Sequence, residues 1–171
     1  NEYFASVGTV ENNVVPICVP TATKLDTVEF NVVNVLTAIN KVKSNLSAGP
    51  DGFPPLMFKR LKHCFAVPLV MIFTQLLSVA AVPNVWKSAV ITPVFKKGAA
   101  GKVINYRPIS LTCVCSKLME RVVSQQMYRY FTDNCILHRE QHGFVKGRST
   151  CTNLLESVND WTLSLRFHRG V

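Results

Sequence analysis

Acidic side chains are scarce in this sequence, in which 10 Asp and Glu residues stand against 19 Lys and Arg residues over a length of 171. The four aspartates are isolated from one another and fall in expected caps, turns or a helix: Asp26, Asp51, Asp133 and Asp160. Phosphoryl transfer with two metal ions needs at least two carboxylates on adjacent rigid strands, which hold the ions about 4 Å apart. The sequence therefore excludes a complete two-metal site in this chain.

The sequence motifs of several other enzyme classes are also missing. There is no Gly-x-x-x-x-Gly-Lys-Ser/Thr phosphate loop, no Gly-x-Gly-x-x-Gly motif and no Gly-x-Ser-x-Gly nucleophile elbow. Hydrolase and dinucleotide-binding functions therefore have no support. Disordered and collagen-like classes are excluded too, because 48% of the residues are hydrophobic and the 8 Gly and 9 Pro are scattered.

Six cysteines are present, and the first residues do not have the pattern of a secretory signal peptide. We therefore expect free thiols in a reducing compartment rather than a disulfide framework. Cys135, His138, His142 and Cys151 have the side-chain types of a zinc site. Their spacing matches no common zinc pattern, so chance clustering is the favoured interpretation and no metal site is predicted.

No charged residue occurs from Cys64 to Trp86, a stretch long enough to cross a membrane. Two prolines, Pro68 and Pro83, and the polar Gln75 interrupt it. These residues favour a buried core helix over a membrane span.

Hydrophobic spacing predicts an α+β chain that is mostly helical with one β-hairpin. An irregular linker is expected over residues 1–25. The expected helices are one capped by Asp26 with an apolar face from Val32 to Val42, then Pro55–Phe65, Leu69–Ala80 with Pro68 in its first turn, Ser116–Phe131, and one from Ser149 after a loop over 135–148. The hairpin is expected over residues 88–95 and 104–112, and Pro93 and Pro108 predict edge or irregular strands.

Basic residues concentrate after residue 40, where 18 Lys and Arg stand against 6 Asp and Glu. A polyanion is therefore the first candidate partner, with a merely soluble basic surface as the alternative. The hairpin carries Lys96, Lys97 and Lys102 at its turn and Arg107 on the returning strand. Two cations facing each other across a hairpin could clamp a triphosphate. An exposed basic turn without a ligand is the commoner outcome of such a sequence.

Five segments occur in a specific order. They are Ser47-Ala-Gly-Pro-Asp-Gly52, Trp86-Lys-x-Ala-x-Ile-x-Pro-x-x-Lys-Lys-Gly98, Asn105-Tyr-Arg-Pro-Ile-Ser-Leu111, Ser116-Lys-Leu-Met-Glu-Arg121 and Gln141-His-Gly-Phe-Val-Lys-Gly-Arg-Ser149. From about residue 26 onward the chain resembles the reverse transcriptases of non-LTR (LINE-type) retrotransposons, in particular Jockey-like elements. The resemblance implies that residues 26–171 form the fingers and the start of the palm of a right-hand polymerase. Residues 1–25 resemble the linker that follows the endonuclease domain in such elements.

The resemblance also implies an RNA-directed DNA polymerase whose partners are an RNA template, a DNA primer and deoxynucleoside triphosphates, with nuclear and cytoplasmic phases and no membrane. It implies that Lys96 and Arg107 contact the triphosphate of the incoming nucleotide. The residues implied to lie near the template are Lys97, Gln141, Gly143, Phe144 and Arg148. Phe144 would pack near the nucleotide pocket and Arg148 would face a backbone phosphate.

Two departures from the family pattern limit these expectations. Residue 145 is Val where the family usually has a basic residue. The resemblance implies that the catalytic aspartates of the family lie on strands beyond Val171, and that a missing palm and thumb of the same polypeptide are partners of this part. We therefore expect a fragment that binds no cofactor itself, whose full-length enzyme uses Mg²⁺, and that does not polymerise alone. The alternative is a non-catalytic nucleic-acid-binding module derived from a retroelement.

Overall fold

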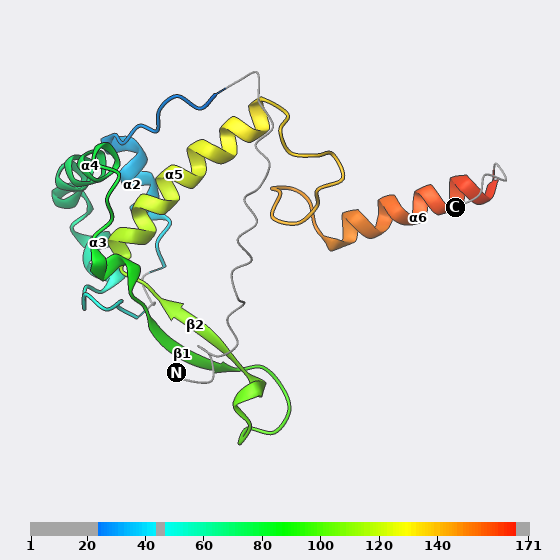
Figure 1. Ribbon diagram of the computed structural model, residues 1–171, viewed down its shortest axis with the longest axis horizontal. Coiled ribbons are helices and arrows are strands. Elements are labelled where there is room, and N and C mark those ends of the chain that lie inside the picture. Colours follow the sequence, from blue (N-terminus) through cyan, green and yellow to red (C-terminus); the bar gives the residue numbers. More distant parts are fainter. Residues whose placement is uncertain (1–23, 44–46, 167–171) are drawn as a thin grey trace. The chain divides into compact units, whose positions relative to one another are not determined.

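The computed structural model describes residues 24–43 and 47–166. Residues 1–23 of the expected linker lie outside the described residues. The described part contains five α-helices and a two-stranded antiparallel sheet, which confirms the α+β class (Figure 1). The chain divides into two compact units, one ending at Met127 and the other beginning at Tyr128.

Helix α2 covers Val32–Asn40, and its N-cap is Asn31. The backbone N–H of Asn34 donates a hydrogen bond of 2.8 Å to the side-chain oxygen of Asn31. The expected cap at Asp26 is therefore wrong, because Asn31 stands where the extended chain turns into the helix and supplies the same kind of acceptor. Val35 and Ile39 are buried, as the apolar spacing predicts.

The next two helices divide at a different place from the one predicted. Helix α3 covers Pro55–Arg60 and helix α4 covers Lys62–Ser78, so the break falls at Leu61 and Pro68 lies inside α4. A proline inside a helix removes one backbone hydrogen bond and strains the preceding turn. The buried side chains of Ala66, before Pro68, and Leu69, after it, offset this cost by anchoring both sides of the proline in the core.

The core of the first unit lies among α2, α4 and α5, the last of which covers Val114–Asp133. Its largest fully buried side chains are Phe73, Ile39, Leu118, Val35, Val114 and Val122. The ring of Phe73 packs against those of Phe30 and Trp86, with centroids 5.4 and 6.1 Å apart. Each large apolar side chain buried in this way contributes roughly 1.5–3 kcal/mol.

Strands β1 (Val90–Phe95) and β2 (Tyr106–Leu111) form the predicted hairpin. Short 3₁₀ turns precede each strand, η1 over Asn84–Lys87 and η2 over Val103–Asn105. In the antiparallel register Pro93 lies opposite Pro108. Lys96 N–H donates to the carbonyl of Asn105 at 2.8 Å, so by alternation the two prolines occupy a non-hydrogen-bonded pair. The sheet therefore loses no cross-strand hydrogen bond to either proline.

In the second unit a loop follows α5 and leads to helix α6, which covers Thr150–Arg166. Ser149 and Thr152 cap this helix reciprocally, because the backbone N–H of each donates to the hydroxyl of the other. Apolar side chains on α6, Leu154, Leu155, Val158 and Trp161, are exposed. In the described part of the chain, no helix is long and apolar enough to cross a membrane.

Candidate functional site

The register of the hairpin places Lys96 and Arg107 on one face. Arg107 pairs with Val94, and Lys96 follows two positions after Val94, one residue past the end of β1. The N–H of Lys96 donates to the carbonyl of Asn105 at 2.8 Å, which continues the ladder by one pair. Because side chains alternate between the faces of a strand and partners across a ladder share a face, Lys96 and Arg107 are diagonal neighbours. Both residues are exposed, and no carboxylate of the described residues forms an ion pair with either. The two cations predicted to bind triphosphate thus lie on the same side of the sheet.

The turn of the hairpin is held by side chains of β2 and of the residue before it. The amide nitrogen of Asn105 donates a hydrogen bond to the carbonyl of Ala99 at 2.8 Å. The hydroxyl of Tyr106 donates to the carbonyl of Ala100 at 3.0 Å. The sequence predicts a flexible turn here, whereas these bonds give the loop a defined course. Asn105 and Tyr106 belong to one of the five sequence motifs, but the sequence alone does not indicate this role.

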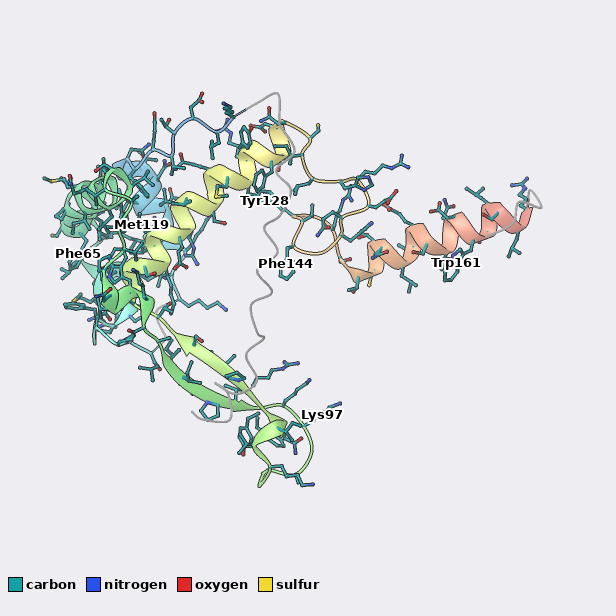
Figure 2. The ribbon with its side chains drawn as sticks, viewed as in Figure 1. Phe65, Lys97, Met119, Tyr128, Phe144 and Trp161 are labelled. Carbon is teal, nitrogen blue, oxygen red and sulfur yellow. The ribbon has the colours of Figure 1, made fainter. Side chains whose placement is uncertain are left out.

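Gly98 begins this loop with a positive φ of 91°. A Cβ atom at this position would approach the side-chain nitrogen of Asn105 to 2.8 Å. Lys97, which precedes it, is exposed at the turn end of the hairpin (Figure 2). The opposite face of the hairpin carries Phe95 and Tyr106, whose rings meet edge to face at 5.4 Å. One face is thus cationic at the turn end and the other is aromatic.

The Gly49–Gly52 turn packs against the junction between β2 and α5. Gly52 N–H donates to the carbonyl of Gly49 at 3.0 Å, which closes the turn. A Cβ atom on Gly49 would come within 2.6 Å of the carbonyl oxygen of Thr112, so only glycine fits without a backbone shift. The first of the five motifs therefore helps fix the base of the hairpin.

Two cysteines lie at the same junction, near Asp51. Burial, and to a lesser extent the negative charge of Asp51, together raise the pKa of the Cys115 thiol to about 11. Burial likewise raises the pKa of Cys113, whose side chain is fully buried. Both thiols therefore stay protonated at neutral pH, as expected for structural rather than reactive cysteines.

In the second unit Arg148 and Gln141 organise the loop before α6. The guanidinium of Arg148 donates to the carbonyls of Arg139 and Gln141, the latter at 3.1 Å. The side-chain amide of Gln141 donates to the carbonyl of Gly143 at 2.9 Å. Arg148 thus has backbone partners within the loop. The phosphate contact implied for it by the resemblance stays a prediction.

Phe144 stands at the tip of this loop with a positive φ of 60°. Its side chain is fully exposed (Figure 2), so it does not pack within the second unit. A left-handed backbone at a bulky residue costs free energy, and such residues occur in tight turns and cluster at functional sites. Exposed aromatic rings at loop tips can stack on unpaired bases.

His142 is the buried residue of this motif, at 7% exposure. Its Nδ1 lies 2.9 Å from the hydroxyl of Thr152 and its Nε2 lies 3.0 Å from a carboxylate oxygen of Glu156. The described residues include no cluster of three or more metal-ligating side chains. The contacts of His142 with Thr152 and Glu156 thus connect the loop to α6. The partner Glu156 is 14 residues away in the sequence, so no local sequence pattern predicts this contact.

A cavity of about 560 Å³ lies within the second unit. Basic residues line it on the loop side, among them Arg139, Lys146 and Arg148. The backbone N–H of Lys146 also donates to the hydroxyl of Tyr128 at 2.8 Å, which fixes one wall. The predicted template residues Gln141 and Arg148 both border this cavity.

No protein-family model matches the chain. Over 122 residues, or 71% of its length, the chain is 32% identical to a Drosophila melanogaster protein named "Probable RNA-directed DNA polymerase from transposon BS". The chain is related to the RNA-directed DNA polymerases of transposons. Over 126 residues, or 73% of its length, it is 25% identical to "Probable RNA-directed DNA polymerase from transposon X-element" from the same organism.

These relatives confirm the reverse transcriptase resemblance drawn from the five motifs. The matched region spans only about 14% of the length of each relative. The relationship supports a reverse transcriptase fragment.

Proposed function

We propose that this chain supplies part of the nucleotide- and template-binding surface of an RNA-directed DNA polymerase, as the fingers and the start of the palm. The observation that carries the proposal is the shared face of Lys96 and Arg107 in a hairpin built from two of the family's motifs. Lys96 directly follows β1 and Arg107 lies in β2, and both are exposed.

The chemistry of the two side chains suits a triphosphate. Arg107 presents a planar fork that can bind two oxygens of one phosphate, and Lys96 adds a mobile point charge. Asn105 and Tyr106 hold the turn beside them, so less order has to be gained on binding. Binding would orient the nucleotide and would not itself transfer its phosphoryl group.

The metal ion of the reaction is not assigned to the described residues. Reverse transcription of the kind expected for the full-length enzyme uses Mg²⁺ held by carboxylates. The described residues offer no cluster that could hold such an ion. We propose that carboxylates beyond the described residues provide it, and that the described part alone does not polymerise.

Template contact is proposed for the loop in the second unit and for Lys97 in the hairpin turn. Phe144 would stack on an unpaired base, and Gly143 next to it leaves room for a close approach. Arg148 and Gln141 would act through the loop shape that their hydrogen bonds maintain.

Nucleotide binding by the 171-residue chain tests this proposal. Titration with a deoxynucleoside triphosphate should show saturable binding that Arg107→Ala weakens roughly 10- to 100-fold, since bonds to charged groups contribute about 1.5–3 kcal/mol. Lys87→Ala, outside the hairpin, is the matched control and should bind like the unaltered chain. Equal affinity for Arg107→Ala and Lys87→Ala would remove Arg107 from the site. Templated synthesis by the chain with Mg²⁺ would contradict the proposed lack of activity.

A non-catalytic nucleic-acid-binding module is the second candidate function. The full exposure of Phe144 favours it, because base stacking needs no catalytic partner. This function predicts RNA binding that weakens with salt and does not change when a nucleoside triphosphate is added.

A further inference from the structure

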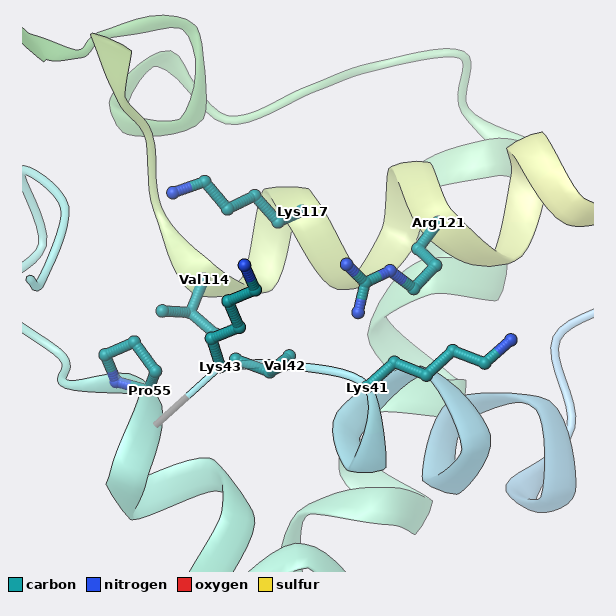
Figure 3. A pocket seen from close by; sticks show the side chains of 7 residues that line it. All are labelled: Lys41, Val42, Lys43, Pro55, Val114, Lys117 and Arg121. Atoms are coloured by element: carbon teal, nitrogen blue, oxygen red, sulfur yellow. The ribbon is translucent and has the colours of Figure 1, made fainter. Parts of the chain in front are cut away.

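A second group of cations lines a cavity in the first unit, beside the start of α5. Lys41 and Lys43 come from the chain just after α2, and Lys117 and Arg121 come from the first two turns of α5. Figure 3 shows Lys43 reaching toward α5 and Arg121 reaching toward α2. The cavity has a volume of about 320 Å³.

The remaining lining residues are apolar, namely Val42, Pro55 and Val114. No acidic residue lines the cavity, and none of the four cations forms an ion pair with a described carboxylate. Glu120 borders an adjoining hollow, where one of its oxygens accepts a hydrogen bond from Ser116 at 2.8 Å. Four like charges around one cavity repel one another, so an anion would stabilise this arrangement.

A purely structural role explains only part of this group. Arg121 donates to the carbonyl of Ala38 at 3.2 Å, and Lys41 is the C-cap residue of α2. Cations at the carboxyl end of a helix interact favourably with its dipole. Within the described residues, the side chains of Lys43 and Lys117 form no hydrogen bond or ion pair with α2, so this structural role does not account for them.

We infer that this cavity binds the phosphodiester backbone of a nucleic-acid strand. The inference rests on the proposed function, because it adds a phosphate-binding site to the same polymerase fragment. The cavity is lined by flexible lysines and by apolar side chains. Such lysines can contact neighbouring phosphates of one strand, and these contacts do not depend on the base sequence. The volume lies within the roughly 300–1,000 Å³ of ordinary ligand pockets, enough for phosphate and sugar groups.

This site is separate from the triphosphate-binding face. Arg107 lies four strand positions before Leu111, or about 13 Å at the usual rise. Val114, which begins α5 and lines the cavity, comes after the end of that strand. A strand of nucleic acid held here would therefore contact the base of the hairpin, away from the residues proposed to hold the nucleotide.

The test measures binding of a fluorescein-labelled single-stranded RNA of about 16 nucleotides to the full chain at several salt concentrations. The test variant combines Lys41→Gln, Lys43→Gln and Lys117→Gln and keeps Arg121, which donates to the carbonyl of Ala38 in α2. The control variant combines Lys24→Gln, Lys59→Gln and Arg60→Gln, which remove the same charge outside the cavity. An arginine variant at the three cavity positions keeps the charge and should bind like the unaltered chain.

Each phosphate contact on a single strand contributes about 0.7 to the slope of log affinity against log salt. The cavity variant should therefore lose about 2 from this slope, and the control variant clearly less. Equal slopes for the two variants, both shown to be folded by circular dichroism, would overturn the inference. The nucleotide titration with Arg107→Ala reports on the hairpin alone, so failure of the proposed function is seen separately. No salt-dependent binding by the unaltered chain would overturn the inference as well.

Discussion

The side-chain amide of Asn105 spans the hairpin turn to bind the carbonyl of Ala99, at a distance of 2.8 Å. This bond joins the end of the turn to its beginning. Together with the bond from Tyr106 to Ala100, it determines the course of the chain between Lys96 and Arg107. The Asn-Tyr pair of the motif is therefore structural, and the Arg that follows is free for a ligand.

Replacing Asn105 should loosen the turn without unfolding the core. Asn105→Ala removes one net hydrogen bond, so amide hydrogen exchange over residues 97–104 should rise about 2- to 10-fold. Tyr106→Phe removes only the bond to Ala100 and should act more weakly. Ser110→Ala, on the same strand, serves as the control. Unchanged exchange in Asn105→Ala would show that the turn is held by its backbone alone.

Gly49 should tolerate no larger side chain. Its Cβ would lie 2.6 Å from a backbone oxygen and 2.7 Å from the backbone nitrogen of Cys113, neither of which can move alone. Gly49→Ala should lower the free energy of unfolding by about 1–3 kcal/mol, measured by urea denaturation. Gly101→Ala is the matched control, because nothing lies within 4 Å of its Cβ position. Similar losses for both variants would contradict the close approach.

Cys115 should react slowly with alkylating agents, since its pKa of about 11 leaves little thiolate at pH 8. The exposed Cys64 should be labelled much faster, as peptide mass spectrometry would show. Equal labelling rates in the folded chain would contradict this assignment.

The same pKa affects stability at high pH. The unfolded thiol ionises near pH 9.0, whereas the folded thiol stays neutral until about pH 11. The unfolded state therefore loses its proton first, and stability falls as the pH rises through this interval. Cys115→Ala should reduce this fall, measured as the change in melting temperature between pH 8 and pH 10. A fall that is identical in the variant would assign it to other groups.

Phe144 should matter for binding more than for stability. Phe144→Gly removes a ring that does not pack in its unit and relieves the positive φ, so the free energy of unfolding should stay equal or rise slightly. Affinity for single-stranded RNA should fall, because stacking contributes about 1–3 kcal/mol per base. Leu155→Ala, on the exposed part of α6, is the control. Loss of stability without loss of affinity would exclude the stacking role.

Local rules predicted the hairpin well, because β-branched strands and a Gly-bearing turn are both short-range signals. They also determined that Lys96 and Arg107 share a face once the register was known. The register itself depends on the course of the turn, which Asn105 and Tyr106 set by hydrogen bonds that composition does not reveal.

Long-range packing explains two features that local sequence rules predict wrongly or do not predict. Pro68 usually marks a helix start, yet the buried Ala66 and Leu69 hold the helix together on both sides of it. No local pattern indicates the role of His142, because its partners Thr152 and Glu156 lie on α6. Such pairings follow from tertiary contacts that one sequence does not show.

The position of Pro93 opposite Pro108 also limits how the hairpin can associate. In a non-hydrogen-bonded pair the backbone groups point outward, toward the free edges of the ribbon. Each proline removes the N–H that a third strand would need at one of these edges. The prolines thus disfavour edge-to-edge strand pairing with another copy of the hairpin on both sides of the ribbon.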